Sequence, residues 1–443
     1  MAAAAGLAGC RLPFTSSPSV LDSLPSYDIP SPTGYIRTNW LKDPTALGSY
    51  SYLSPNPAGA GLRRMLSEPV EGRLFFTGEA TAISHPATVG GAVESGLRTA
   101  GLISSGRPGR SVTIIGAGAS GLACARKLSD DGLDVTVLET RDVAGGRVRS
   151  EELAGVPAEL GASWVQPLTG NPLVGFAEDA GIELVPFEYE YDFINPAQER
   201  AGLNGEGQLH RGLRSLDDKT WAQAAVTPVS DAFPVRQTPG LQWAITYDIS
   251  QEYGADPEDL SVLATWEGGS YRGGDALVAG NYADLLTTAA GDLPVEFNTT
   301  VKSVDLSGDG VEIKTTDGHT FDSELAVVTV PLGVLKAGSV DFIPELPAAN
   351  RLAINGLGMG VLDKLWLAFD EVFWEPDAEM FQWIDPDRPG LWAEWINGNH
   401  YLGKPMLMGL NGGSQAADLS NWSDEEVLRS GMSALERMHN GSG

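Results

Sequence analysis

The sequence predicts an α/β fold with α+β character, divided into two domains, and three observations lead to this prediction. The chain has 443 residues, which is too long for one ordinary core. It is 42% apolar and contains 54 glycines and 28 prolines, a mixture typical of a compact globule with many turns. Finally, residues 111–139 read as strand, glycine-rich turn, helix and strand, the unit from which parallel sheets are built.

Within this unit, residues 112–115 are a short apolar run, typical of a strand buried in a parallel sheet. The turn Gly116-Ala-Gly118-Ala-Ser-Gly121 follows. A helix is then expected up to Gly132, because apolar residues recur at near-helical spacing, at Leu122, Ala125, Leu128 and Leu133. A second strand is expected over residues 134–138, and it stops at Glu139.

Each part of the unit has a physical role in binding a dinucleotide. Gly116 permits the tight turn, Gly118 lets a pyrophosphate approach the backbone, and Gly121 lets the helix pack on the strand. The helix N-terminus presents free N–H groups and the positive end of its dipole to the phosphates. Glu139 stands where an acid accepts hydrogen bonds from a ribose. The whole context, and not the glycines alone, predicts a dinucleotide site.

The choice of dinucleotide depends on the residues just downstream. Arg141 and then Gly145-Gly146-Arg147 follow the acid. A second glycine pair and a positioned arginine suit a cofactor longer than NAD, with Arg147 near the pyrophosphate or the flavin. FAD is therefore the expected cofactor, although an ordinary loop with a surface arginine is the structural alternative.

Charge and composition exclude several classes of partner. With 58 acidic and 29 basic residues the formal charge is −29, so nucleic acid and anionic membranes are poor partners, whereas a cationic substrate is attracted. The acidity could equally serve solubility alone. No apolar run is long enough to span a bilayer. The 2 cysteines and 5 histidines show no metal-ligand spacing, so no metal is expected.

The N-terminus loosely resembles a secretion signal but lacks a basic start. A soluble protein, cytoplasmic or otherwise intracellular, is favoured over a secreted one, and the compartment is left open. The oligomeric state is also left open.

From residue 116 to residue 150 the sequence resembles the N-terminal signature of the flavin-containing amine oxidases, which include polyamine oxidases, monoamine oxidases and lysine-specific histone demethylases. Further similar blocks are Glu159-Leu-Gly-Ala-Ser-Trp164, Gly170-Asn-Pro-Leu173, Val328-Thr-Val-Pro-Leu-Gly-Val-Leu335 and Gly358-Met-Gly-Val-Leu-Asp-Lys364. The resemblance covers residues 33–438 and favours the polyamine oxidase branch. It implies a Rossmann-type FAD-binding domain interleaved with a substrate-binding domain of mixed sheet and helices.

The order of the blocks departs from that family. Residues 73–81 and 86–92 resemble its last block, and residues 34–40 and 48–52 resemble segments that normally lie near the C-terminus, yet here all precede the first strand. This is the order of a circular permutant, in which residues up to about 105, moved to the end, restore the family layout. Residues 101–110 are then a Gly/Ser/Pro-rich join. An engineered rearrangement or an artefact of gene prediction would give the same order.

The predicted domains are consequently discontinuous. The FAD-binding domain comprises residues 72–164 and 290–335, and the substrate-binding domain comprises residues 28–71, 165–289 and 336–440. Residues 1–27 match no block and are expected to form an unassigned, poorly ordered tail.

The resemblance also implies which residues hold FAD. Glu79, in the turn with Gly78, bonds a ribityl hydroxyl, and the helix expected after Pro86 aims the N–H groups of Thr88 and Val89 at the flavin. Val301 is a further expected contact. Monoamine oxidases bind FAD through a cysteine in the segment matching residues 48–53, which has none here, so FAD is expected to be noncovalent.

Three residues are the expected catalytic group. The lysine that matches Lys364 holds a water beside flavin N5 in the family, although a lysine on a strand is usually just solvated. Tyr52 matches an aromatic wall beside the flavin, but Tyr50 and Tyr52 could also be one face of a strand. Trp164 is expected near the flavin, with a structural core role nearly as plausible.

Acidic residues give weaker signals for a cationic substrate. Glu394 falls roughly where polyamine oxidases place a second aromatic, and it could hold a distal ammonium, but a surface position is the stronger expectation. Glu188, Glu190 and Asp192 alternate with aromatic residues and either line a tunnel for cations or belong to a half-exposed strand.

The resemblance implies an FAD-dependent amine oxidase that converts a small cationic amine, favouring a polyamine, to an imine while O2 is reduced to H2O2. One alternative is an L-amino-acid oxidase, which needs an arginine opposite the flavin; the sequence offers no obvious candidate, although Arg272 is unassigned. A histone demethylase is less favoured, because no long helical insertion splits the chain. A non-catalytic flavin-binding relative, impaired by the permutation, is the alternative from another class.

Overall fold

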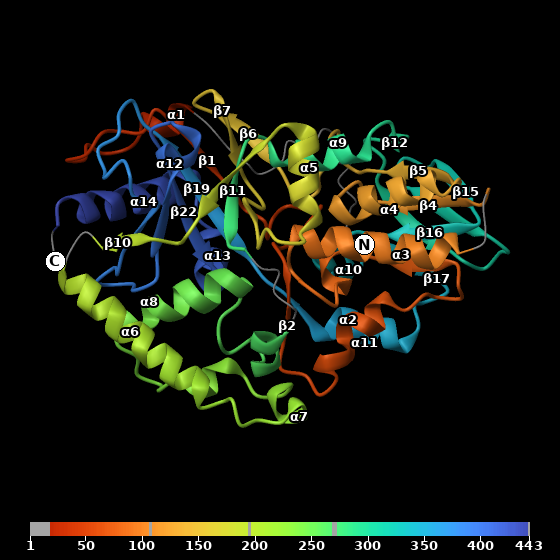
Figure 1. Cartoon of the computed structure of the whole chain (residues 1–443), viewed down its shortest axis with the longest axis horizontal. Helices are drawn as coiled ribbons and strands as arrows, with labels where there is room; N and C mark the ends of the chain where they lie inside the picture. Colours follow the sequence, from red (N-terminus) through yellow and green to blue (C-terminus); the bar gives the residue numbers. More distant parts are fainter. Residues whose placement is uncertain (1–17, 106–108, 194–195, 268–272, 442–443) are drawn as a thin grey trace, which may run out of the picture.

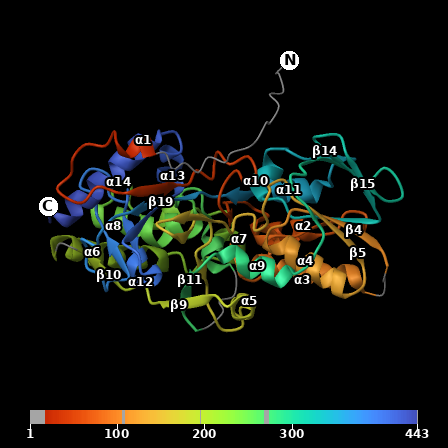
Figure 2. The same cartoon turned by 90° about the horizontal axis from the view of Figure 1, so that it is seen from above.

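The computed structural model describes residues 18–105, 109–193, 196–267 and 273–441. Cys10, Arg272 and part of the expected join at residues 101–110 lie outside the described residues. The chain has the predicted α/β character, with two main sheets at opposite ends of the long axis (Figure 1). The view from above separates them in the same way (Figure 2).

The first main sheet is parallel and has the order β12-β5-β4-β16-β3. Its strands are short apolar runs, as predicted, because both faces are buried. Alternate side chains of β4 show this: Val112 and Ile114 face one core, and Ile115 faces the other. The bounds are β3 (Leu74–Phe76), β4 (Ser111–Ile115), β5 (Asp134–Leu138), β12 (Val295–Glu296) and β16 (Leu325–Val328).

Helices cover one face of this sheet. α3 (Val89–Ser104) packs along α4 (Ala119–Asp130), and Gly96 of α3 makes this possible, because a Cβ there would lie 2.3 Å from the Ser120 carbonyl oxygen. Leu97 of α3 is 41% exposed and takes no part in this packing. α5 (Pro172–Ala180) and α9 (Tyr282–Ala290) join the same layer.

A four-stranded sheet, β15-β14-β13-β17, shares a core with the other face of the parallel sheet. Its bounds are β13 (Val301–Asp305), β14 (Val311–Thr315), β15 (Thr320–Ser323) and β17 (Asp341–Ile343).

The second main sheet is mixed and has the order β1-β19-β22-β21-β20-β10, with only β10 and β20 parallel. One face packs under α14 (Asp424–His439), and the opposite face carries Lys364 and Trp366. The bounds are β1 (Gly34–Arg37), β10 (Tyr191–Phe193), β19 (Leu362–Ala368), β20 (Met380–Gln382), β21 (Glu394–Asn397) and β22 (Met406–Gly412).

Smaller elements connect the two main sheets. The remaining strands are β2 (Ser51–Leu53), β6 (Ser150–Leu153), β7 (Val156–Glu159), β8 (Trp164–Val165), β9 (Glu183–Phe187), β11 (Asp275–Ala279) and β18 (Leu357–Met359). The remaining helices are α1 (Pro18–Leu21), α2 (Leu62–Ser67), α6 (Pro196–Arg214), α7 (Trp221–Ala224), α8 (Pro239–Ile245), α10 (Leu332–Lys336), α11 (Ala348–Gly356), α12 (Gly398–Leu402) and α13 (Gly413–Leu419). A π-helical turn, Thr246–Gln251, continues α8.

Residues 18–27 belong to the fold, contrary to their expected place in a poorly ordered tail. Val20, Leu21 and Leu24 pack on the core beneath α14. Just beyond, the backbone N–H of Asp28 donates to Glu436 of α14 at 2.6 Å. Apolar burial against α14 therefore orders this segment.

Candidate active site

A cavity of about 860 Å³ is lined by residues of both main sheets. Ligand pockets usually have 300–1,000 Å³, so a large cofactor together with a small substrate needs a cavity at the upper end of this range. Every predicted site residue except Gly121 lines it: Tyr52, Gly78, Glu79, Thr88, Val89, Gly116, Gly118, Glu139, Arg141, Gly145, Gly146, Arg147, Trp164, Val301 and Lys364. The sequence thus predicted residues that the fold gathers around one space.

The glycine-rich turn forms one end of the cavity. Gly116 has a φ of +111°, and a Cβ there would lie 2.4 Å from Thr329 Oγ1. Gly121 lies behind the lining, where a Cβ would come 2.0 Å from the Gly116 carbonyl oxygen. α4 begins after Gly118 without a side-chain cap, so its first N–H groups are open to an anion.

The second glycine pair lies beside the first turn. Gly118 and Gly145 form a bridge, and a Cβ on Gly146 would come 3.3 Å from the Gly118 Cα. Arg141 donates to the Gly146 carbonyl oxygen at 2.7 Å and pairs with Asp43 at 2.6 Å. Arg141 therefore holds the glycine pair in place as well as lining the cavity.

Glu139 ends β5 at the cavity and is nearly fully buried. Its carboxylate accepts from the backbone N–H groups of Ala117 at 2.8 Å and Arg141 at 2.9 Å. These bonds fix its orientation and leave further lone pairs for a ribose hydroxyl.

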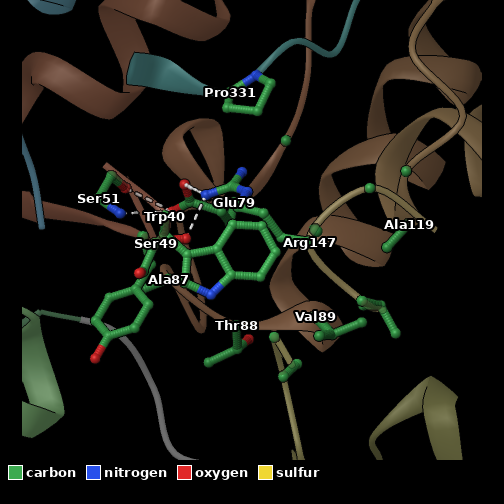
Figure 3. Close-up of a pocket in the computed structure, with 18 of the residues that line it drawn as sticks. Trp40, Ser49, Ser51, Glu79, Ala87, Thr88, Val89, Ala119, Arg147 and Pro331 are labelled. Atoms are coloured by element: carbon green, nitrogen blue, oxygen red, sulfur yellow. Dashed lines mark hydrogen bonds and ion pairs between the residues drawn. The ribbon is translucent and has the colours of Figure 1, made fainter. Parts of the chain in front are cut away.

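Glu79, which is buried, and Arg147, which is partly buried, form an ion pair at 3.0 Å, and their side chains point toward one another in Figure 3. Glu79 also accepts from Ser51 Oγ at 2.6 Å, and Arg147 donates to the Ser49 carbonyl oxygen at 2.8 Å. Burial acts to raise the pKa of Glu79, but the charges of Arg147 and Arg63 outweigh it and hold the pKa below its ordinary value. Glu79 is therefore a fixed carboxylate.

The N-terminus of α3 faces the same space, with Thr88 and Val89 in the lining (Figure 3). The Thr88 hydroxyl caps the helix by accepting from the Gly91 N–H at 2.9 Å. A Cβ on Gly91 would lie 1.9 Å from the His85 carbonyl oxygen, so no side chain could replace this glycine without moving the turn.

These features fit FAD. An uncapped helix start among glycines accepts a pyrophosphate, a fixed acid at the end of β5 accepts a ribose, and a second helix start offers N–H groups to a ring that gains negative charge.

Lys364 lies on β19 and is 3% exposed. Its Nζ donates to the carbonyl oxygens of Glu159 at 3.1 Å and Gly161 at 2.5 Å, and it lies 2.6 Å from Ser163 Oγ. Burial lowers the pKa of Lys364, against the charge of Glu159, which raises it. The alternative of a merely solvated lysine therefore does not hold.

The two predicted aromatic residues face the same cavity. The Tyr52 ring lies over Gly358, where a Cβ would be 2.1 Å from the ring, so the glycine of β18 is what admits the tyrosine. Trp164 packs edge-on against Phe187 at 6.1 Å, and Lys364 Nζ lies 5.9 Å from the indole centre.

Three carboxylates in the lining have no hydrogen bond or ion pair with a described residue: Asp248, Glu252 and Glu394. The expected surface position of Glu394 is wrong, because it is 5% exposed on central strand β21. Burial raises its pKa to about 8, and Asp248 and Glu252 add to this effect. Burial and the charge of Glu206 likewise raise the pKa of Asp248 to about 6.

Sequence reasoning missed Asp248 and Glu252. Their spacing of four residues, which places two side chains on one side of a helix, was the available signal. The π-helical turn that contains Asp248 and ends just before Glu252 has no sequence pattern of its own. In the run 188–192 the acids are exposed and the tyrosines are partly buried, as in the half-exposed alternative, and Tyr189 lines the cavity.

The fold and this cavity define a class of protein, and comparison with known sequences establishes it. The model of the family described as flavin containing amine oxidoreductase matches residues 20–104, 119–243 and 232–442. The chain belongs to this family. It is an FAD-dependent amine oxidase, an oxidoreductase that acts on an amine with O2.

Individual relatives agree with this class. Polyamine oxidase 4 of Oryza sativa subsp. japonica is 29% identical over 356 residues, covering 74% of this chain and 72% of the relative. Polyamine oxidase 2 of Arabidopsis thaliana is 30% identical, with the same coverages. Lysine-specific histone demethylase 2 of Homo sapiens is 28% identical, and the match covers 83% of this chain but 48% of the demethylase.

Among solved structures, a double mutant of putrescine oxidase redesigned at its cofactor site superposes with a TM-score of 0.58 at 20% identity, covering 75% of this chain and 82% of that one. This similarity supports the fold.

Two expected absences concern only the part of the chain that the structure describes. There, no helix is long and apolar enough to cross a membrane. Within the same ranges, no group of three or more His, Cys, Asp or Glu residues could hold a metal ion.

Proposed function

We propose that the oxidised amine carries a second ammonium group, so that the substrate is a diamine or polyamine. The observation that carries this proposal is Glu394, a buried carboxylate that lines the cavity without a partner among the described residues. A buried charge without a partner is costly, and a cation from the ligand removes that cost.

The sheet places Glu394 at a defined distance from Lys364. Both residues pair with Leu410 of β22, so the three lie in one row across the sheet and all line the cavity. Two strand spacings separate the backbones of Lys364 and Glu394 by about 10 Å across the sheet. An amine that reacts beside Lys364 can therefore extend a second ammonium toward Glu394.

We propose that the predicted residues hold FAD noncovalently. The N-terminus of α4 binds the pyrophosphate, Glu139 the ribose, and the turn at Gly78–Glu79 with the start of α3 the flavin end. Cys124, the described cysteine, is fully buried in α4 away from the cavity lining, which supports noncovalent binding. When bound, FAD accepts a hydride from the carbon next to the amine nitrogen and passes the electrons to O2.

The chain's own residues then orient the amine. Tyr52 and Trp164 confine it between aromatic rings, and an amine–aromatic contact contributes about 0.5–2 kcal/mol, depending on desolvation. Lys364 acts beside the reacting atoms, and Glu394 binds the far ammonium.

The first test is Glu394→Gln. A hydrogen bond to a charged group contributes about 1.5–3 kcal/mol, so KM for 1,4-diaminobutane should rise about 10- to 100-fold. The value of kcat/KM for butylamine, which has no second ammonium, should stay within about twofold. Steady-state peroxide release with both amines measures this.

Asp192→Asn is the matched control, because Asp192 is an exposed acid of the same sheet that does not line the cavity. It removes one negative charge and should leave both amines unaffected. An equal loss for both amines in Glu394→Gln, or none for either, would contradict the anchoring role.

The pKa of Glu394 gives a second test. Below about pH 8 this carboxyl is protonated in the free protein, and binding of an ammonium favours its ionised form. The ratio of kcat/KM for 1,4-diaminobutane to that for butylamine should therefore rise as pH increases from 6 to 8. The ratio cancels the ionisation of the reacting amine, which both substrates share. A ratio as pH-dependent in Glu394→Gln as in the wild type would contradict the assignment.

We also propose that the segment order is a circular permutation, with the two domains divided as the sequence predicts. The parallel sheet takes all five strands from residues 72–164 and 290–335, and the mixed sheet takes its strands from the other segments. Asp28 lies beside Glu436, so residues that the family order would join are neighbours. A chain rejoined as residues 110–440 followed by 28–105 should fold and bind FAD; an insoluble or flavin-free product would argue against the permutation.

A further inference from the structure

The hydrogen-bond partners of Lys364 and Glu159 determine where one buried proton lies. Lys364 Nζ has three oxygen neighbours: the carbonyl oxygens of Glu159 and Gly161, and Ser163 Oγ. Carbonyl oxygens only accept, so Nζ must donate to both of them. The hydroxyl of Ser163 can either accept or donate, and its direction depends on the charge of the lysine.

If Lys364 is an ammonium, it donates all three protons and Ser163 accepts. The hydroxyl proton of buried Ser163 then has no acceptor among the described residues. If Lys364 is a neutral amine, its two N–H bonds serve the two carbonyl groups and its lone pair accepts from Ser163. Each donor then meets one acceptor, so the geometry favours the neutral amine.

The hydrogen bonds of the Glu159 carboxyl can be counted in the same way; Glu159 is 2% exposed. Ser150 Oγ lies 2.5 Å from Glu159 Oε1 and 2.9 Å from Asn281 Oδ1. The Asn281 amide orientation is set by the Ala283 N–H, which donates to Oδ1 at 3.1 Å. Ser150 has one hydroxyl proton and cannot donate to both oxygens. Both Ser150 contacts are hydrogen bonds only if the Glu159 carboxyl is protonated and donates to Ser150, while the same Oε1 still accepts from the Tyr282 N–H at 2.8 Å.

We propose that Lys364 and Glu159 rest as a neutral pair, an unprotonated amine and a protonated carboxyl, with Ser163 donating its hydroxyl proton to Lys364 Nζ. Relative to an ion pair, one proton has moved from the lysine to the glutamate and the net charge is unchanged. Glu159 and Ser163 are positioning residues in this arrangement, since they act through Lys364.

The surroundings of the pair agree with this assignment. Burial raises the pKa of Glu159 and lowers that of Lys364, so the buried site disfavours both charged forms. The other ionisable groups that face the pair are Tyr282 and Asp284 from α9, Tyr401 from α12, and, across the cavity, Glu394. Tyr282 and Tyr401 have pKa values raised by burial and are uncharged at neutral pH.

The neutral pair has a consequence for the substrate, and it rests on the proposed role of Lys364 in the reaction. The cavity that Lys364 lines must admit an ammonium-bearing ligand, and a lysine cation there would repel it. About 10 Å away, Glu394 attracts the far ammonium. Moving the proton to Glu159, which does not line the cavity, removes the like charge while keeping Nζ in place.

The test combines infrared and NMR spectroscopy on the FAD-loaded enzyme without substrate. The spectrum of wild type minus Glu159→Gln at pH 7 should show the C=O band of a protonated carboxyl. In protein with 13C-labelled lysine, the Cε signal of Lys364 should have the position of a neutral amine at pH 7. The proposal would be overturned if Glu159→Gln removed an ionised carboxylate band instead, or if the Lys364 signal were typical of an ammonium.

Several controls keep the result unambiguous. Glu152→Gln, an exposed change on the same hairpin, should show only a carboxylate difference. The chain has eight lysines, and Lys336, whose pKa burial also lowers, is assigned with Lys336→Met. If Glu159→Gln does not fold, the Lys364 Cε signal of the wild-type protein at pH 7 decides alone whether the lysine is neutral.

The outcome is separable from the proposed function. A neutral pair found together with wild-type rates in Lys364→Met would leave the proton assignment intact and refute the catalytic role of Lys364. An ion pair together with a slow Lys364→Met would do the opposite.

Discussion

Lys364→Met should retain FAD and lose about 10²-fold or more in turnover, within the range of 10²–10⁴ that a positioned proton-transfer group contributes. Methionine has a similar length and preserves the apolar packing of the stem, but it removes all three contacts of Nζ. The Glu159 carbonyl keeps a donor, the indole N–H of Trp366 at 3.0 Å, so the fold should tolerate the change. Stopped-flow measurement of flavin reduction and of reoxidation shows which half-reaction slows.

Lys336→Met is the matched control. Lys336 Nζ also donates to three carbonyl groups, those of Ile354, Asn355 and Leu357, but Lys336 does not line the cavity. The two variants therefore lose similar hydrogen bonds at different places. Lys336→Met should have wild-type rates, and wild-type rates for both half-reactions in Lys364→Met would refute the assignment.

Gly121→Ala should weaken FAD binding by about 10- to 100-fold. A Cβ at this position would lie 2.0 Å from the Gly116 carbonyl oxygen, so α4 must move away from the turn that receives the pyrophosphate. Overpacking of this kind costs about 1–3 kcal/mol, and each 1.4 kcal/mol corresponds to tenfold in affinity. Titration of the apoprotein with FAD, followed by flavin fluorescence, measures the loss.

Gly175→Ala provides the comparison, because Gly175 lies in helix α5 with nothing within 4 Å of its Cβ position. It should leave FAD affinity unchanged and stabilise the helix by about 0.5–1 kcal/mol. Equal FAD affinities for Gly121→Ala and Gly175→Ala would show that the close packing at Gly121 is not needed for binding.

The parallel sheet was predicted well because the apolar runs and the glycine turn in the sequence agree with the way the folded chain buries them. The second predicted strand coincides with β5, Asp134–Leu138, and β4 starts one residue before the expected run. A strand buried on both faces is a continuous apolar run, and in the glycine turn the positive φ of Gly116 and the close contact at Gly121 both require glycine. Gly116, Gly121 and Gly145 each have a steric reason, because a Cβ there would lie 2.4, 2.0 and 2.4 Å from a neighbouring oxygen.

The substrate end of the site was harder to predict because its residues meet only through the sheet. Glu394 and Lys364 are 30 residues apart, and a pairing through β22 that the sequence does not encode locally brings them into one row. Because a glutamate on a strand is usually exposed, a surface position was expected for Glu394. Asp248 and Glu252 reach the cavity through a π-helical turn, and Lys364 meets Glu159 across two separate strands.

The cationic substrate was predicted from charge and resemblance, but net charge alone could not locate it. The acidic run at residues 188–192 attracted attention because it is dense, yet its acids are exposed. Asp248, Glu252 and Glu394 form no dense run in the sequence, and only the folded chain brings all three to the lining of one cavity.

The most direct test of the whole account is anaerobic titration of the purified, FAD-loaded protein with 1,4-diaminobutane, butylamine and an L-amino acid. The flavin absorbance should bleach fastest with the diamine, more slowly with the monoamine, and not with the amino acid, whose carboxylate would meet the acidic lining. Bleaching by the L-amino acid alone, or by none of a broad panel of amines, would contradict an amine oxidase that selects a second ammonium.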